Sequence, residues 1–416
     1  MALLPIVYTL LLGLIASAIV PAGALRTPQS LHALRSSVEY LQGYTFDDFI
    51  EEHNRTYRKG TPAYDEREAL FEERRKLVIQ FNSKPGLSWK MGLCEFMDYT
   101  RAERSRLLGY TGSGSRSVGY AEPAEAAELR GQALNIPTSY SVEEADSKLL
   151  TLIRNQGNCG SCWAEAATTV LEGQMARNKT LMRFLAAARE NGAKGVPPVP
   201  TLSSQMVVSC TPNERHCGGR GGCTGATAEL AYDMIRARGG LPFAVEWNYE
   251  SGYSGNTPTC RQGLFQHPRI AISGFEVLAS NRLAPLKEAL VASGGPIVVS
   301  VDATNWFEYS EGIYSDTNLG RKGDFTVNHA VTLMAYKEPQ LGARGYWVIR
   351  NSWGDYWGEA GKIRLEMKPN EEEHCGWDYS THDGLACDGD PDQAWVCGTC
   401  GVLYDSTYPT GLHLVL

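Results

Sequence analysis

The stretch that decides the fold reads Asn155-Gln156-Gly157-Asn158-Cys159-Gly160-Ser161-Cys162-Trp163-Ala164-Glu165-Ala166. The residues from Trp163 to Gln174 have the pattern of a helix, and Ser161 is a suitable residue to cap its N-terminus. A thiol at a helix N-terminus lies at the positive end of the helix dipole, which stabilises the thiolate, the attacking form of cysteine. Gln156 precedes Cys162 by six residues, where its amide could donate to an oxyanion together with the backbone N–H of Cys162. The stretch therefore predicts a nucleophilic cysteine.

Two further blocks supply what a thiol nucleophile needs, a base and a group that orients the base. The first is Val327-Asn328-His329-Ala330-Val331, which leads into an apolar run with the pattern of a buried strand. A lone histidine beside a core strand is usually structural. The second block, Asn351-Ser352-Trp353-Gly354-Asp355-Tyr356-Trp357-Gly358, begins twenty-two residues after that histidine. Because Cys159-Gly160-Ser161-Cys162-Trp163 fits the C-G-[SA]-C-[WY] signature of papain and cathepsins, the chain resembles the papain-like cysteine proteases.

The resemblance is nearest to cathepsin L in layout and implies a role for each residue of these blocks. Cys162 would be the nucleophile and His329 its base. Asn351 would hold the imidazole, and Trp353 would shield that contact and border the substrate. The implied activity is a cysteine endopeptidase that hydrolyses peptide bonds through a Cys-His-Asn site, with Gln156 as oxyanion donor and with no metal or organic cofactor.

The same resemblance implies a cleft for an extended substrate. In Gly222-Cys223-Thr224-Gly225-Ala226, the last two residues would present backbone to the peptide, an approach that only small residues permit. In the closing segment, Asp405 falls at the floor of the S2 pocket, which receives the second side chain before the scissile bond (P2). An acid there accepts arginine as well as apolar side chains. The alternative is that Asp405 turns to solvent at a strand edge.

The expected fold is α+β, with a helical lobe carrying Cys162 and a β-barrel-like lobe carrying His329 and Asn351. A helical inhibitory propeptide would precede these lobes. The expected divisions are a signal peptide at 1–24, the propeptide and a linker at 25–133, and the papain-like peptidase domain at 134–416. The protein would be a zymogen and a monomer whose partners are peptide substrates and its own propeptide.

Composition favours the secretory pathway. The chain has eleven cysteines, many for a cytosolic protein, and an apolar run from Leu3 to Val20 before Ala22-Gly23-Ala24, a small-residue pattern typical of signal cleavage. An uncleaved membrane anchor is the alternative. A net charge of −8 without a basic stripe argues against nucleic-acid binding. We expect a lysosome, a digestive vacuole or the extracellular space, and the sequons at Asn54 and Asn178 permit glycosylation.

The segment before the peptidase domain has the features of a propeptide. Apolar and charged residues recur at helical spacing from Asp65 to Phe81, and Glu72 and Lys76 are placed for a helical ion pair. Gly92-Leu93-Cys94-Glu95-Phe96-Met97-Asp98 resembles the family's second propeptide motif, with cysteine in place of asparagine. Residues 111–133 have the composition of a cuttable linker. We expect the propeptide to inhibit the enzyme and to be released by acid.

Three departures from the family pattern stand out. Glu165 occupies a position that normally holds phenylalanine, where it could perturb the thiol, turn to solvent or pair with a local cation. Residues 178–201 contain an insertion with an expected extra helix from Met182 to Asn191. A second insertion, 375–400, carries cysteines.

The cysteines do not all pair by analogy. The resemblance implies the disulfides Cys159–Cys223 and Cys210–Cys260. The five others of the mature part are Cys217, Cys375, Cys387, Cys397 and Cys400. Their pairing stays open, and disulfides are the commoner interpretation in a secreted protein. The alternative is a zinc site formed by His374, Cys375, His382, Cys387, Cys397 and Cys400.

Two rival functions deserve comparison. A catalytically silent binding protein on the same scaffold is disfavoured because Gln156, Cys162, His329 and Asn351 are all chemically competent. An exopeptidase of the cathepsin B type would carry paired histidines in a loop that blocks the cleft, and none lie between Cys223 and Cys260.

Overall fold

The computed structural model describes residues 35–110, 136–145, 153–198, 200–319 and 324–416. The expected signal peptide and the linker at 111–133 lie outside these residues. Among the helices of the described part, none combines the length and the apolar character needed to cross a membrane.

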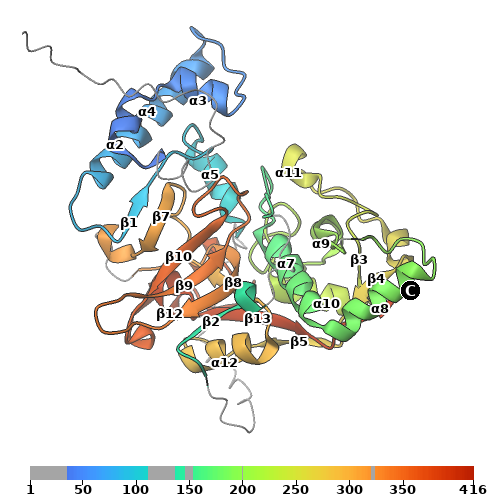
Figure 1. Cartoon of the computed structure of the whole chain (residues 1–416). Helices are drawn as coiled ribbons and strands as arrows, with labels where there is room; N and C mark the ends of the chain where they lie inside the picture. The colour runs from blue at the N-terminus through green and yellow to red at the C-terminus, as the bar shows by residue number, and fades with distance from the viewer. Residues whose placement is uncertain (1–34, 111–135, 146–152, 199, 320–323) are drawn as a thin grey trace, which may run out of the picture.

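The N-terminal unit is a small helical domain, drawn in blue in Figure 1. Its elements are α2 (Val38–Gly43), α3 (Phe46–Glu52), α4 (Pro62–Asn82), β1 (Trp89–Met91) and α5 (Arg101–Leu108). Capping boxes at Thr45 and Thr100 start α3 and α5, and Pro62 stands in the first turn of α4. The helix predicted over 65–81 is confirmed within α4. The predicted ion pair between Glu72 and Lys76 is wrong, because Glu72 pairs with Arg75 at 2.7 Å. Arg75 also donates to a backbone oxygen of α2.

The helical lobe is built around α7, which is buried along nearly its whole length. Its elements are α7 (Cys162–Arg177), α8 (Lys179–Glu190), α9 (Ser204–Cys210), α10 (Ala228–Ala237), α11 (Ser251–Ser254), the short helix η1 (Gln262–Gln266) and the sheet of β3 (Leu241–Pro242), β4 (Arg269–Ala271) and β14 (His413–Val415). The extra helix expected in the first insertion is confirmed as α8. Ser161 stands at the N-cap of α7 as expected, but its side chain makes no cap hydrogen bond, and its Oγ instead lies 2.6 Å from the Tyr249 hydroxyl.

The β lobe is dominated by a sheet with the strand order β1-β7-β10-β9-β8-β6-β13-β5, in which β2 also pairs with β8. Its elements are β2 (Ser139–Ser141), α6 (Val142–Ala145), β5 (Gly274–Val277), α12 (Leu283–Ser293), β6 (Ile297–Val301), β7 (Tyr309–Tyr314), η2 (Asp316–Leu319), β8 (His329–Lys337), β9 (Gly345–Arg350), β10 (Lys362–Met367) and β13 (Asp405–Thr410). The strand predicted after His329 is confirmed as β8. Strands β6 and β8 are buried on both faces, whereas buried and half-buried residues alternate along most of β9.

The second insertion forms a small hairpin beside the sheet. It consists of η3 (Glu371–Glu373), β11 (Cys375–Asp378), η4 (Thr381–Asp383), β12 (Ala394–Cys397) and η5 (Thr399–Gly401). Trp377 and Trp395 face each other across β11 and β12 with ring centroids 5.0 Å apart.

The two lobes meet where α7 packs against β8, and in Figure 1 α5 of the N-terminal unit runs down between them. Strand β1 pairs with β7, so the N-terminal unit also adds an edge strand to the sheet of the β lobe. The α+β, two-lobed class with a helical segment in front is confirmed.

Candidate active site

Cys162 is the first residue of α7 and is fully buried. Its Sγ accepts from the backbone N–H of Ala330 at 3.3 Å and donates to the carbonyl oxygen of Leu108 at 3.4 Å. Ala330 belongs to β8, and Leu108 belongs to the N-terminal unit. The thiol therefore lies at the junction of three parts of the molecule.

His329 opens β8 on the other side of this junction. Its Nε2 lies 2.8 Å from Oδ1 of Asn351, and its Nδ1 lies 3.0 Å from the Leu108 oxygen that also contacts the thiol. The Trp353 ring packs on the imidazole with centroids 5.0 Å apart. The three residues predicted from separate sequence blocks are thus brought together, and Asn351 and Trp353 fix the orientation of the ring.

Gln156 lies in the loop before α7 and is fully buried. Its Nε2 donates to the oxygens of Leu107 and Cys159, both at 3.0 Å, and its Oε1 accepts from Ser352 at 2.7 Å. Ser352 fixes which end of the amide faces the cleft. The donor end therefore already holds a carbonyl oxygen of the N-terminal unit.

The segment from Leu107 to Tyr110 covers the site. A Cβ added to Gly109 would lie 2.2 Å from Sγ of Cys162, so only glycine permits this approach. A Cβ added to Gly225 would lie 2.3 Å from the oxygen of Gly109, which places the segment against the loop that was expected to face a substrate. Tyr110 is buried, and its N–H donates to the oxygen of Asn328 at 3.2 Å.

This cover keeps the thiol and the imidazole neutral. Burial raises the pKa of Cys162 to about 12, against the lowering effect of backbone hydrogen bonds. Burial lowers the pKa of His329 to about 4, although its contacts with Asn351 and Leu108 favour the protonated ring. Between these values the thiolate–imidazolium pair does not form while the N-terminal segment stays in place.

Glu165 pairs with a local cation, one of the alternatives that the sequence left open. Its Oε2 lies 3.1 Å from Arg154, which also contacts Glu172 at 2.7 Å, and the Glu165 side chain is only 2% exposed. Its charge also contributes to the raised pKa of Cys162, after burial. Turning to solvent is excluded.

Asp405 begins β13 and faces the interior rather than solvent. Its Oδ2 accepts from Ser300 at 2.5 Å, and the Ser300 hydroxyl lies 3.0 Å from the Tyr110 hydroxyl. Burial raises the pKa of the Asp405 carboxyl. Ala226 is fully buried, and together with Tyr110 it belongs to the core of the helical lobe.

Four disulfides are present in the structure. They join Cys159 to Cys223, Cys210 to Cys260, Cys217 to Cys387 and Cys375 to Cys397. The last two resolve most of the pairing that the sequence left open, and they use three of the cysteines of the zinc alternative. Among the described residues, no group of three or more potential ligands is placed to hold a metal.

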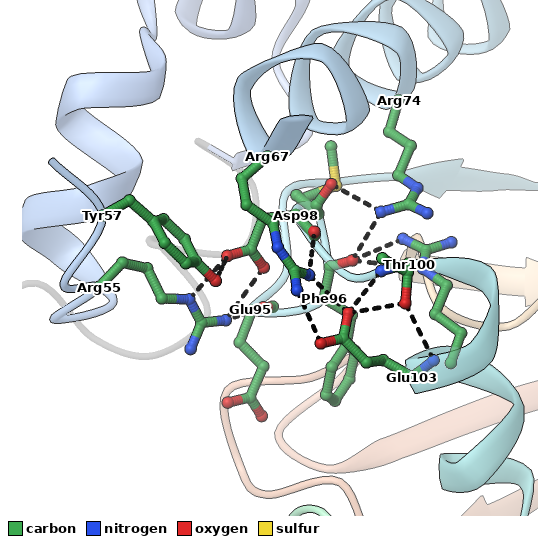
Figure 2. A network of polar contacts seen from close by, with 11 residues as sticks. Arg55, Tyr57, Arg67, Arg74, Glu95, Phe96, Asp98, Thr100 and Glu103 are labelled. Atoms are coloured by element: carbon green, nitrogen blue, oxygen red, sulfur yellow. Dashed lines mark hydrogen bonds and ion pairs between the residues drawn. The ribbon is translucent and has the colours of Figure 1, made fainter. Parts of the chain in front are cut away.

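A polar network holds the N-terminal unit in its docked form, as Figure 2 shows. Arg67 of α4 contacts both oxygens of Glu103 in α5, and Arg55 donates to Asp98 at 3.0 Å. Arg74 reaches the oxygens of Phe96 and Met97 from the same face of α4. The Phe96 ring leaves this network and packs on the Trp353 ring at 5.6 Å. The network thus ties the helices of the unit to the aromatic residue that enters the site.

The thiol and the imidazole lie together, and a segment of the same chain covers them. This arrangement is that of the precursor of a cysteine-dependent hydrolase. Two family models identify the protein more narrowly. The model of papain family cysteine proteases matches residues 136–383, and the model of the cathepsin propeptide inhibitor domain (I29) matches residues 46–103. The chain therefore belongs to the papain family of cysteine proteases and is a zymogen with that family's propeptide. Its resemblance to this family, expected from the sequence, is confirmed.

Individual relatives agree with this assignment. The senescence-specific cysteine protease SAG12 of Arabidopsis thaliana is 27% identical over 374 residues, which cover 87% of this chain and 88% of that protein. Procathepsin L of Mus musculus is 28% identical over 334 residues, covering 78% and 86%. The solved structure of a recombinant stem bromelain precursor has a TM-score of 0.61 at 25% identity, covering 88% of this chain and 97% of that chain. Digestive procathepsin L 3 from the larval midgut of Tenebrio molitor shares the fold, with a TM-score of 0.61 at 20% identity and coverage of 89% and 99%.

Sequence reasoning missed two parts of the site. Leu107 and Leu108 end α5, and Gly109 and Tyr110 follow it, without a recognisable motif, although this Leu-Leu-Gly-Tyr stretch is unusually apolar for the end of a charged helix. Arg154 was missed because its partners Glu165 and Glu172 lie eleven and eighteen residues further on and meet it only through the tertiary fold.

Proposed function

We propose that this protease is a cysteine endopeptidase in which Cys162 attacks the peptide carbonyl and His329 exchanges the protons. The observation that carries the proposal is the shared contact of Cys162 Sγ and His329 Nδ1 with one carbonyl oxygen, that of Leu108. Both atoms therefore face the same point, where the carbonyl of a substrate can take the place of the propeptide.

The chemistry follows from this placement. With the propeptide gone, the Cys162 thiol passes its proton to His329, and the thiolate attacks the carbonyl carbon. Gln156 Nε2 and the Cys162 backbone N–H hold the resulting oxyanion. The imidazolium gives its proton to the leaving amine as the C–N bond breaks, which leaves a thioester. His329 then takes a proton from water, and attack by that water releases the acid and restores the thiol.

Asn351 and Trp353 act as positioning residues in this scheme. The Asn351 oxygen accepts from Nε2 and so keeps Nδ1 directed at the thiol. An internal cleavage site is supported by the path of the propeptide, which passes Cys162 with Arg106 on one side and Tyr110 on the other. An exopeptidase would close the cleft on one side of the nucleophile.

The substrate loop and the S2 floor belong to the same proposal. Gly225 and Ala226 face the extended chain, and Asp405 stands at the floor of the pocket that Tyr110 occupies in the precursor. The enzyme then cleaves substrates that carry either Leu or Arg at P2, with Arg favoured only while Asp405 is ionised. Because burial raises the pKa of Asp405, the preference for Arg declines as the pH falls.

The expected processing route is part of the proposal too. Residues 1–24 would be removed as a signal peptide, and 25–133 as propeptide and linker, leaving a monomeric enzyme of 134–416. The disulfides and the propeptide support passage through the secretory pathway to a lysosome, a digestive vacuole or the exterior.

The decisive test is Cys162→Ala in the processed enzyme with a fluorogenic P2-Leu peptide. Turnover should fall by at least about 10³-fold, because no other group replaces the thiolate. Cys400→Ala, which removes a second buried thiol outside the site, should retain activity, whereas Cys159→Ala should mainly impair folding. A folded Cys162→Ala enzyme that kept its turnover would refute the assignment.

A further inference from the structure

A cavity of about 600 Å³ lies behind Asp405, between α10, β13 and the insertion hairpin. A volume of this size falls within the range of whole small-ligand sites, about 300–1,000 Å³. It therefore exceeds what a leucine side chain needs. Its lining residues on the hairpin include Trp377, Trp395 and Pro391, and the residues from α10 include Glu229 and Leu230.

The charge of this chamber is one-sided. Four acidic residues line it, and the described lining contains no lysine, arginine or histidine. Two of the acids are already engaged: Asp378 accepts from the N–H of Val327 at 2.9 Å, and Asp390 accepts from the N–H of Cys387 at 2.8 Å. Of the other two, Asp405 accepts from Ser300 through Oδ2, whereas Glu229 has a buried carboxylate oxygen, Oε1, that could receive a positively charged guest.

Glu229 is the less satisfied of this pair. Its Oε1 is buried and makes no hydrogen bond to the described residues. Burial and the neighbouring Asp405 raise its pKa to about 8. Placing two like-charged carboxylates together in a buried site costs free energy, which a cation between them would offset.

The chamber continues the place that Tyr110 fills in the precursor. The Tyr110 hydroxyl contacts Ser300, and Ser300 donates to Asp405, which lines the chamber. A Cβ on Gly218 would lie 2.9 Å from the Tyr110 ring, so the tyrosine is held tightly on its other side. When the propeptide leaves, the Tyr110 side chain leaves with it, and the path toward Asp405 and Glu229 opens.

The far wall of the chamber is fixed by covalent and polar links. The Cys217–Cys387 disulfide joins the hairpin to the loop before α10, and Cys375–Cys397 closes the hairpin itself. His216 lies 2.7 Å from Asp388 and adds a polar latch beside the first disulfide. Links at these points limit the movement of the wall that the hairpin forms.

We propose that this chamber extends the P2 side-chain pocket and that Glu229 is a second specificity-determining carboxylate, which together with Asp405 selects long side chains ending in a planar cation. The inference rests on the proposed function, which places Asp405 at the S2 floor. A guanidinium has five donors in a planar fork and can bridge two carboxylates, whereas an ammonium is a point charge. The Trp377 and Trp395 side chains give an aromatic or aliphatic stem an apolar wall.

The preference should depend on pH. The acids that face the pair are Asp378 and Asp390 from the hairpin and Asp233 from α10, and Tyr404 lies beside Asp405. Each of these groups is either negatively charged or neutral near pH 7, so none of them repels a cation. In the empty chamber Glu229 takes up its proton as the pH falls through about 8, so its ionised form at neutral pH depends on the cation that binds beside it. As the pH falls further, both carboxyl groups are protonated and the attraction for a cation weakens.

The experiment compares kcat/KM of the processed enzyme on peptides with Leu, Lys, Arg or 4-guanidinophenylalanine at P2. The variants are Glu229→Gln, Asp405→Asn and the control Glu190→Gln, at an exposed position of α8 outside the chamber lining. Glu229→Gln should lower the Arg/Leu and guanidinophenylalanine/Leu ratios about tenfold, and Glu190→Gln should leave them unchanged. Trp395→Ala should weaken the guanidinophenylalanine substrate selectively, unlike Tyr379→Ala on the same hairpin.

The outcomes separate this inference from the proposed function. If Asp405→Asn lowers the ratios and Glu229→Gln does not, the chamber is refuted and the S2 floor stands. If neither variant changes them, both specificity claims are wrong, while cleavage of the P2-Leu peptide still tests the cysteine mechanism and the folding of each variant. Failure to cleave the guanidinophenylalanine peptide, with P2-Arg cleaved, would also overturn the chamber.

Discussion

Gly109 is a residue at which the propeptide packs directly against the Cys162 thiol. Its φ of +81° is a backbone conformation that favours glycine, and an added Cβ would lie 2.2 Å from Cys162 Sγ. Gly86 offers a matched control, because its φ is +73° and nothing lies within 4 Å of an added Cβ. Both positions share the backbone strain of a substitution, and only Gly109 adds the clash.

We predict that Gly109→Ala in the full-length chain displaces the propeptide from the thiol, and that Gly86→Ala does not. The measurement is the rate at which iodoacetamide labels Cys162 at pH 7. Labelling should rise at least about tenfold in Gly109→Ala, because each 1.4 kcal/mol of lost docking free energy gives a factor of ten. Equal labelling of both variants would show that strain, and not the clash, governs docking.

The thiol itself should titrate differently before and after processing. With the propeptide docked, burial raises the pKa of Cys162 to about 12 and lowers that of His329 to about 4. We predict negligible labelling of Cys162 in the precursor between pH 5 and pH 8, and ready labelling of the processed enzyme over the same range. Mass spectrometry of the labelled peptide checks this, with Cys94 as an internal buried thiol. A precursor labelled as fast as the enzyme would contradict the cover formed by Leu107 to Tyr110.

At the scale of elements, α3 carries an acid-sensitive histidine. His53 ends this helix and packs on the Phe49 ring at 4.5 Å. Burial, with the charges of Arg55 and Arg35, lowers its pKa to about 4 against the opposing effect of Glu52. The unfolded chain therefore binds a proton between about pH 6.5 and pH 4 that the folded unit does not, and stability falls as the pH drops through this window.

We predict that His53→Gln makes the propeptide helices less sensitive to acid. In an inactive Cys162→Ala background, the protection factors of the amides in α3 and α4, taken relative to the intrinsic exchange rate at each pH, should fall from pH 6.5 to pH 4 by an amount equivalent to about 1–3 kcal/mol. His53→Gln should flatten this dependence. His413→Gln, at an exposed position of β14, should not. An unchanged pH profile in His53→Gln would remove this histidine from acid activation.

The ion pair between Arg67 and Glu103, which joins α4 to α5, resists mild acid. The hydrogen bond from Arg67 lowers the pKa of Glu103 to about 2. Its contribution is therefore present above about pH 4.5 and is lost only as the pH falls toward 2. Mild acid therefore does not loosen this pair, and Glu103 does not contribute to a release of the propeptide between pH 6.5 and pH 4.5.

The sequence predicted the elements that depend on contacts between residues near one another in the chain, and it did not predict those that depend on distant contacts. The helix at 65–81 and the strand after His329 follow from local periodicity, and the order of Cys162, His329 and Asn351 follows from three local blocks. The Cys217–Cys387 disulfide spans 170 residues, and no local pattern encodes it. The side chain of Ser161 makes no cap hydrogen bond for a similar reason, because the tertiary fold brings the Tyr249 hydroxyl to it.

At the scale of the whole molecule, the precursor shares one core between the propeptide and the β lobe. Trp89 of β1 packs on Tyr314 at 4.6 Å and pairs with β7 through the backbone. Arg104 of α5 contacts Glu308 at 2.6 Å and covers the Phe307 ring. The propeptide is thus an integral layer of the β lobe, and its removal exposes part of that core.

Phe96 is the side chain on which this shared layer most directly meets the site. It is 3% exposed and packs edge-on against Phe307 at 5.8 Å and Trp353 at 5.6 Å, while Arg104 holds its backbone oxygen at 2.8 Å. Truncating a buried phenylalanine to alanine costs about 3–5 kcal/mol. Part of that loss falls on docking, because the ring contacts the peptidase domain.

We therefore predict that Phe96→Ala in the full-length chain increases the labelling of Cys162 at pH 7 by about 10²-fold, the equivalent of about 3 kcal/mol. Phe184→Ala, at an exposed position of α8 that is 63% exposed, should leave labelling unchanged. Amide exchange of α4 in the same samples separates undocking from unfolding, since α4 stays protected if only the interface is lost. Labelling that remained at the level of the unmodified chain, with α4 protected, would mean that docking depends on β1 and α5 and not on the ring beside Trp353.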